Sequence, residues 1–382
     1  RKPVVREDLK EQWVSEFNNF ETQLNGTRET LKPVREDAIQ YFEQLGFPHV
    51  KIEDWKYTSL KNVLKPDYYL GHQVAKPNVS RETIDQARVS DITTNLVVLI
   101  NGRYSDEHSQ LIDGEDQVYI RSLRQAQVEA PQFVQQYIGQ YLDYTQDGIS
   151  ALSTAFIDDG VVIHVSKNKA PEYPVQILHI HDVNDQNLFI QPRNLWVLEQ
   201  SAELKVIENF HTLGDNNSFL NYTIEGHVAP NAHLKHYKLQ NDQLNAYQVS
   251  QIEMAQEQDS TISNYTVTLG NGFTRNNTNY RVNGENCETN LYGLYLTDGK
   301  QFADNHTIVD HKVPRCESNE LYKGIVDDRS VSVFNGKVFV RPHAQQTNAY
   351  QSNRNILLDD KATVNAKPQL EIWADDVKCS HG

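Results

Sequence analysis

Two residues near the end of the chain, Cys379 and His381, could hold a metal. They lie two positions apart, so both side chains share one face if the segment is extended. A thiolate and an imidazole are ligands that suit iron, and a neutral imidazole can also accept a proton. Two side chains do not complete a tetrahedral site, so a partner would have to supply the remaining ligands. A purely structural interpretation, a buried cysteine beside a hydrogen-bonded histidine, stays open at this point.

Other histidines have weaker patterns. His179 and His181 share one face of a predicted strand, with their Cα atoms about 7 Å apart. No third or fourth ligand is evident, so we interpret the pair as part of a solvated strand face. His233 and His236 are three positions apart on a predicted strand and must face opposite sides, so neither is assigned a ligand role.

The familiar signatures of hydrolases and metalloproteases are absent: the sequence has no Gly-x-Ser-x-Gly and no His-Glu-x-x-His. Residues 293–300 (GLYLTDGK) resemble a phosphate-binding loop. However, the two glycines are one residue too far apart, and Gln301 stands where a Mg²⁺-binding Ser or Thr belongs. We predict a hairpin turn here and expect any ATP chemistry to come from another chain.

Charge and composition exclude several classes of partner. The chain of 382 residues has 36 basic and 51 acidic side chains, and therefore a formal net charge of −15. This charge disfavours binding to nucleic acid and to anionic membranes. No run approaches the roughly 18 apolar residues of a membrane helix, and the first residues do not resemble a signal peptide. Three widely spaced cysteines, Cys287, Cys316 and Cys379, indicate a reducing cytoplasm rather than a disulfide framework.

The elements that position these residues fall into three predicted regions. Residues 1–90 should be helical: apolar residues recur at three- and four-residue steps from Leu9 to Leu24, with Gly26 as the stop, and a second helix is expected over 33–45. Residues 91–160 should form a mixed α/β connecting region.

Within this connecting region we predict a strand over 92–100 and helical structure over 122–157, with Ser122 as the N-cap. The remaining residues, 161–382, contain short alternating strands to the end of the chain. This last region therefore determines the fold class.

A weak repeat runs through this last region. Four segments share a polar residue, a small residue and then an alternating strand, and their starts are 30, 28 and 27 residues apart: 201–207, 231–237, 259–265 and 286–292. Strand modules at nearly fixed spacing indicate a stacked solenoid or β-helix. An irregular β-sandwich remains the alternative from the pattern alone.

The C-terminal residues 367–382 (KPQLEIWADDVKCSHG) closely resemble the signature of the SufB/SufD family of iron–sulfur cluster assembly proteins. The resemblance continues through residues 305–311 (NHTIVDH), 333–340 (VFNGKVFV) and 344–349 (AQQTNA). Near the N-terminus, Gly46-Phe47-Pro48 and residues 53–58 (EDWKYT) resemble the SufD branch. The match spans nearly the whole chain and is most specific at its C-terminal end.

This resemblance implies a mainly β protein with a right-handed parallel β-helix core and an N-terminal helical domain. It implies a non-catalytic scaffold in the cytoplasm, acting with a SufB-type paralogue and two copies of a SufC-type ATPase. Iron–sulfur clusters would form transiently where the paralogues meet, with His381 near a SufB cysteine and Cys379 as the weaker candidate. We expect no cofactor to be stably bound to the isolated chain. The family's C-terminal helical segment, which contacts the ATPase, is expected to be absent because the chain stops at Gly382.

Two other functions are alternatives to the scaffold role. A carbohydrate-active β-helix enzyme, similar to polysaccharide lyases, would need clustered aspartates for Ca²⁺ and an Arg or Lys base, and no aspartate ladder is evident. The second alternative is a homomeric structural solenoid without metal. For the isolated chain we predict a homodimer, because the sheet edges of a β-helix need covering.

Overall fold

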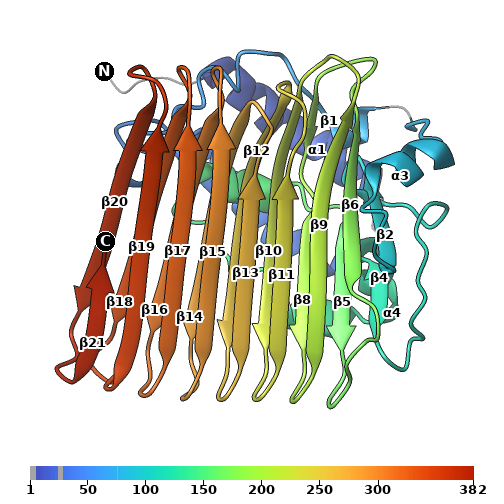
Figure 1. Ribbon diagram of the computed structural model, residues 1–382. Helices are drawn as coiled ribbons and strands as arrows, with labels where there is room; N and C mark the ends of the chain where they lie inside the picture. The colour runs from blue at the N-terminus through green and yellow to red at the C-terminus, as the bar shows by residue number, and fades with distance from the viewer. Residues whose placement is uncertain (1–5, 25–28, 75) are drawn as a thin grey trace.

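The computed structural model describes residues 6–24, 29–74 and 76–382 (Figure 1). It confirms a mainly β fold with a solenoid of about eight coils and an N-terminal helical region. The α-helices are α1 Glu7–Leu24, α2 Lys32–Leu45, α3 Arg81–Ala87, α4 Leu123–Glu129, α5 Pro131–Tyr137 and α6 Gly148–Ala155. Three short 3₁₀ helices cover Glu29–Leu31, Glu53–Trp55 and Gly71–Gln73.

Each coil of the solenoid contributes one strand to each of two sheets. Sheet A runs in the order β20-β18-β16-β14-β12-β10-β8-β5-β4, with β7 paired to β10 and β1 to β7. Its strands are β1 Tyr69–Leu70, β4 Tyr119–Ser122, β5 Val161–Val165, β7 Leu188–Ile190, β8 Arg193–Leu198, β10 Ser218–Val228, β12 Ala246–Gln256, β14 Phe273–Val282, β16 Phe302–His311, β18 Val331–Val340 and β20 Thr363–Ile372.

Sheet B runs in the order β21-β19-β17-β15-β13-β11-β9-β6-β2-β3. Its strands are β2 Asn95–Ile100, β3 Arg103–Tyr104, β6 Val175–Asp182, β9 Glu203–Leu213, β11 His233–Gln240, β13 Thr261–Thr268, β15 Glu288–Thr297, β17 Glu317–Val326, β19 Thr347–Leu357 and β21 Val377–His381. In Figure 1 the chain rises through sheet B in front, descends through sheet A behind and advances to the left with each coil, so the solenoid is right-handed. Strands β2, β3 and β4, from the expected connecting region 91–160, extend the two sheets.

The sequence repeat corresponds to one corner of the solenoid. Its four starting residues all have left-handed backbone conformations, at Ser201, Asn231, Asp259 and Asn286, with φ of 60°, 58°, 60° and 58°. Asn and Asp tolerate this conformation better than most side chains. The same corner continues at Arg315 and Gln346, both with φ of 60°, where the residue types conceal the repeat from sequence analysis.

The structure differs from the sequence-based predictions at one turn, residues 293–300, and in one helical segment, residues 122–157. Residues 293–300 form the end of β15 and the turn to β16, and these strands lie in different sheets, so the turn is a solenoid corner and not a hairpin. The helical structure predicted over 122–157 is three short helices, because Pro131 starts α5 and Gly139, with φ of 80°, follows it. Ser122 does cap α4, since its hydroxyl accepts a hydrogen bond from the Gln125 amide at 3.0 Å.

The helical region covers the outer face of sheet A, behind the sheets in Figure 1. Trp13 of α1 stacks on Phe189 of β7, with ring centroids 4.5 Å apart. Helix α2 ends at Leu45 and is followed, as predicted, by Gly46, whose φ of 65° favours glycine. The predicted stop of α1 at Gly26 lies outside the described residues. The N-terminal helices are therefore packed against the solenoid.

The main core lies between the two sheets and contains polar side chains among apolar ones. The prediction of a solvated face for His179 and His181 is wrong: both face the interior, and each is 2% exposed or less. The opposite face of β6 is covered as well, because Leu178 and Ile180 pack with Ile84 of α3. An alternating strand buried on both faces cannot be distinguished by its pattern from one that is half solvated.

Candidate functional site

Cys379 and His381 lie on β21, the edge strand of sheet B at the C-terminal end of the solenoid. The parallel pairing of β21 with β19 sets Cys379 beside Ala349 and His381 beside Gln351. Ala349 and Gln351 are buried and point between the sheets. Because side chains in register share a face, Cys379 and His381 both lie on the interior side of the last strand.

The two side chains differ in their surroundings. Cys379 is half-buried against Val338, Val340 and Ala374, and this burial raises the pKa of its thiol above the ordinary value. His381 is exposed. The cysteine is therefore held in its protonated form at neutral pH unless a cation displaces the proton, whereas the imidazole is open to an approaching partner.

These two residues do not form a complete metal site within the described chain. Among the described residues, the one group of three possible ligands within 4.8 Å of one another is Asp327, Asp328 and Asp359. These aspartates are exposed or half-exposed and lie at turns, away from Cys379 and His381. The pair on β21 is thus an incomplete donor set.

Behind His381 the interior is polar. The Glu320 carboxylate accepts a hydrogen bond from the Thr307 hydroxyl, and its other oxygen accepts one from the Gln351 side-chain amide at 3.2 Å. Burial raises the pKa of Glu320 to about 7. Glu320 was not predicted from the sequence, although its alternation with Ser318 and Tyr322 along β17 is a signal that it faces inward.

A second buried polar group lies farther along the interior. Glu208 accepts hydrogen bonds from His179 Nε2 at 2.9 Å and His236 Nε2 at 2.6 Å, with all three residues buried. His236 and His233 do face opposite sides, as predicted, but His236 has a structural partner that the spacing did not reveal. Burial by itself raises the pKa of Glu208, but the two imidazoles stabilise the charged carboxylate and hold its pKa below the ordinary value.

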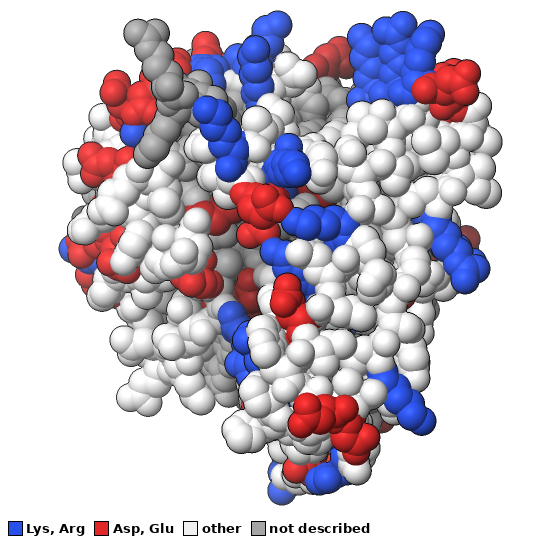
Figure 2. Space-filling model, turned by 90° about the vertical axis from the view of Figure 1, so that its left-hand side faces the viewer, with Lys and Arg blue, Asp and Glu red and all other residues white. Residues whose placement is uncertain are grey.

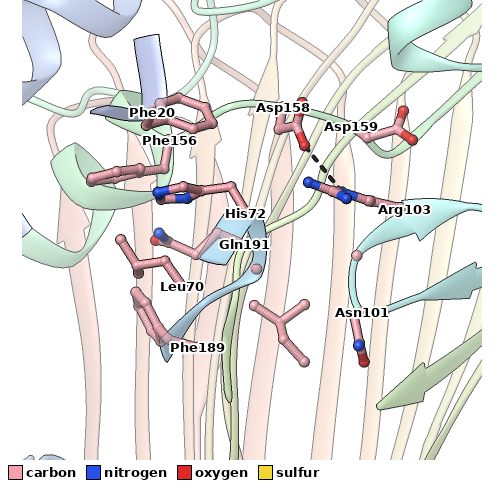
Figure 3. Close-up of a pocket in the computed structure, with 13 residues that line it drawn as sticks. Phe20, Leu70, His72, Asn101, Arg103, Phe156, Asp158, Asp159, Phe189 and Gln191 are labelled. Carbon is pink, nitrogen blue, oxygen red and sulfur yellow. Dashed lines mark ion pairs between the residues drawn. The ribbon is translucent and has the colours of Figure 1, made fainter. Parts of the chain in front are cut away.

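Among the cavities where the helical region meets the solenoid, two are lined by paired charges. The first, of about 40 Å³, has room for a few water molecules only (Figure 3). His72 lies beside Phe156 in it, and Arg103 points to Asp158, with Nε 3.4 Å from the carboxylate. Burial raises the pKa of the neighbouring Asp159 to about 6. These contacts join the two parts of the protein and leave no space for a substrate.

The second cavity, of about 210 Å³, lies on the outer face of sheet A and is lined by groups of both charges. Lys337 pairs with Asp54 at 2.7 Å, and Arg275 pairs with the buried Asp304 at 3.1 Å. The Arg275 guanidinium also lies 3.8 Å from the Trp55 ring. The Lys337–Asp54 pair and the Arg275–Trp55 contact attach the helical region to the solenoid, whereas the Arg275–Asp304 pair lies within sheet A.

The C-terminal end of the solenoid also exposes apolar side chains. Figure 2 shows this end of the molecule, where uncharged surface lies beside a central band of acidic and basic side chains. The exposed apolar residues of the last strands and turns are Tyr350, Ile356, Leu357, Leu358, Ile372 and Trp373.

Across the described ranges, the helices are too short or too polar to cross a membrane.

Comparisons with known proteins match this architecture in two parts. A model of the SUF system FeS cluster assembly SufBD core domain matches residues 181–382, and a model of the SufBD protein N-terminal region matches residues 7–177. An iron–sulfur cluster assembly SufBD family protein of Synechocystis sp. is 29% identical over 368 residues, covering 94% of this chain and 80% of that protein. The iron–sulfur cluster assembly protein SufD of Escherichia coli is 29% identical over 359 residues, covering 92% and 79%. SufD of Bacillus subtilis is 24% identical over 371 residues, covering 92% and 80%.

Proposed function

The chain belongs to the SufBD family of SUF iron–sulfur cluster assembly proteins, and from this premise we propose that it is a non-catalytic scaffold subunit. It acts in the cytoplasm beside a SufB-type paralogue and a SufC-type ATPase. The nascent cluster is its cargo and is held transiently in the complex. The observation that carries the proposal is the incomplete donor set of Cys379 and His381 on an edge strand.

His381 is the main ligand in this proposal. Its imidazole is exposed, so it can bind iron in the neutral form without moving any neighbour. Cys379 can bind only after losing a proton that its half-buried setting retains. Iron can displace that proton, so Cys379 contributes less and its contribution grows with pH.

The partner completes the site from across the end of the solenoid. Strands β20 and β21 are the edges of the two sheets in the described chain, so they present backbone groups for a further strand on each side. The apolar side chains from Tyr350 to Trp373 named above supply area that a paralogue of the same shape can bury. A thiolate from the SufB-type paralogue then reaches the cluster from the opposite side.

The ATPase is a separate chain in this proposal, because residues 293–300 are a solenoid corner and not a phosphate-binding loop followed by a helix. In the isolated chain, a second copy covers the edge strands in place of the paralogue. The isolated protein is therefore a homodimer that binds iron weakly.

The test uses the complete complex, produced in cells that depend on this pathway and purified without oxygen. The His381→Ala complex should assemble normally but contain several-fold less iron and acid-labile sulfide, and Cys379→Ala should lose less. His343→Ala is the matched control, because His343 is an exposed histidine in the turn after β18 and should retain full cluster content. A His381→Ala complex with full cluster content would remove His381 from the site.

A further inference from the structure

Two cysteines that the proposed function does not use lie next to each other in consecutive coils. Cys287 comes directly before β15 and Cys316 directly before β17. The strands pair with Glu288 beside Glu317, and the Glu317 amide donates a hydrogen bond to the Cys287 carbonyl at 2.9 Å. Neighbouring strands lie about 4.8 Å apart. This spacing falls within the Cα separations of about 4.4–6.8 Å that disulfides span.

The side chains of the two cysteines converge as well. The Cys287 thiol is 3.1 Å from the Gly284 carbonyl oxygen, and the Cys316 thiol is 3.2 Å from the same oxygen. Sharing one acceptor brings the two sulfur atoms together on one side of the corner. Both residues are only 2% exposed, yet exposed residues flank each of them in the chain, so the pair lies one layer below the surface.

The contact between the thiols makes them unequal. A hydrogen bond from Cys316 lowers the pKa of Cys287 to about 7, and the same contact raises the pKa of Cys316. Cys287 is therefore the nucleophile of the pair, and Cys316 keeps its proton.

We propose that Cys287 and Cys316 form an oxidation site at which a hydroperoxide converts two thiols into a disulfide between consecutive coils. The Cys287 thiolate attacks the peroxide, an S–O bond forms and the O–O bond breaks, and the leaving oxygen takes up a proton as water or alcohol. The Cys316 sulfur then attacks the sulfenic acid of Cys287. The S–S bond forms, and the departing hydroxide leaves as water with the Cys316 proton.

The disulfide would fasten the coil of β15 to the coil of β17. A solenoid is held together by contacts between neighbouring coils, so it can separate from its ends. Cys379 and His381 lie on β21, in the last coil, and β17 lies two coils before it. A covalent link between the coils of β15 and β17 would limit how far separation of the coils can proceed from this end. The proposal stands independently of the cluster-binding role, since neither thiol belongs to that site.

The experiment treats the folded, fully reduced chain with hydrogen peroxide and measures intact mass and tryptic peptides without reduction. We expect a loss of two hydrogens, a linked peptide pair containing Cys287 and Cys316, and full reversal by dithiothreitol. Cys379→Ser should give the same link, because it removes only the half-buried thiol near the chain's end. Circular dichroism before and after oxidation establishes that the fold is retained.

The order of attack is tested by trapping sulfenic acid with dimedone. Cys316→Ser should be labelled at Cys287, and Cys287→Ser should give at least several-fold less label at Cys316. The proposal is overturned if folded wild-type chain forms no 287–316 link at a peroxide dose that oxidises free cysteine in the same tube. It is also overturned if the link forms only after denaturation, or if peroxide oxidises the two cysteines to sulfinic acid without forming the link.

Discussion

At the scale of single residues, the interior of the solenoid tolerates charge only where hydrogen bonds compensate for it. Glu208 is fully buried, and two histidines donate to its two oxygens. An unpaired carboxylate in that position would be costly, so such a residue requires its partners. His181 has a weaker arrangement: its Nδ1 lies 3.2 Å from the Ser218 hydroxyl, and no carboxylate offsets its burial.

His181 therefore predicts a measurable pH dependence of stability. Burial lowers its pKa from 6.5 in the unfolded chain to about 3 in the folded protein, with smaller contributions from His179 and His211. Between these values only the unfolded chain binds the proton, so falling pH removes about 1.4 kcal/mol of stability per pH unit. His181→Gln should lack this loss.

The measurement is urea unfolding of wild type and His181→Gln at pH 7.5, 6.5 and 5.5. The free-energy difference between the two proteins should change by about 1 kcal/mol between pH 6.5 and 5.5, because the unfolded imidazole is already half protonated at pH 6.5. His343→Gln, at an exposed position, should follow the wild-type pH dependence. Parallel curves for wild type and His181→Gln would show that His181 does not carry the effect.

At the scale of elements, the left-handed corners fix the coil length. Asn231 has φ of 58°, and its side-chain amide donates to the Ser201 hydroxyl of the preceding coil at 3.0 Å. A β-branched residue is disfavoured in this conformation by about 1–2 kcal/mol, and it also loses the inter-coil hydrogen bond.

Asn231→Val should thus lower the free energy of unfolding by about 2 kcal/mol, measured by urea titration. Asn231→Gly is the matched control, because glycine adopts the same φ without strain and loses only the hydrogen bond. Equal losses for the two variants would mean that the backbone conformation contributes nothing.

The helices and coils show what the sequence could predict. Apolar spacing located α1 and α2, and the polar corner residues predicted the solenoid, because both signals are local. The breaks after α4 and α5 were harder to predict, since Pro131 is also a normal first residue of a helix. The partners of Glu208 and Glu320 lie 13 or more positions away in the chain, and their pairing depends on register between coils, which no local pattern contains.

The candidate site and the cysteine pair likewise include one feature that the local sequence predicts and one that it does not. The shared face of Cys379 and His381 follows from strand alternation and was predictable. The closeness of Cys287 and Cys316 was not, since they are 29 positions apart in the chain and only the coil length brings them together.

At the scale of the whole molecule, the two sheets of the described chain end at β20 and β21, where uncharged surface lies beside a central band of charged side chains (Figure 2). Light scattering of the isolated chain should give twice the chain mass of 43.9 kDa. Trp373→Asp should shift the protein toward the monomer, because it places a charge in the exposed apolar surface. A wild-type protein that stays at 43.9 kDa at high concentration would contradict the homodimer.

A bond between His381 and cluster iron is the central claim of the proposed function. Pulsed electron paramagnetic resonance of the reduced complex, prepared with ¹⁵N-histidine in this chain alone, detects that bond through nitrogen hyperfine coupling. We predict a ¹⁵N coupling in the wild-type and His343→Ala complexes and its loss in the His381→Ala complex. A ¹⁵N coupling that persists in the His381→Ala complex, or a wild-type cluster without it, would contradict the assignment of His381 as a cluster ligand.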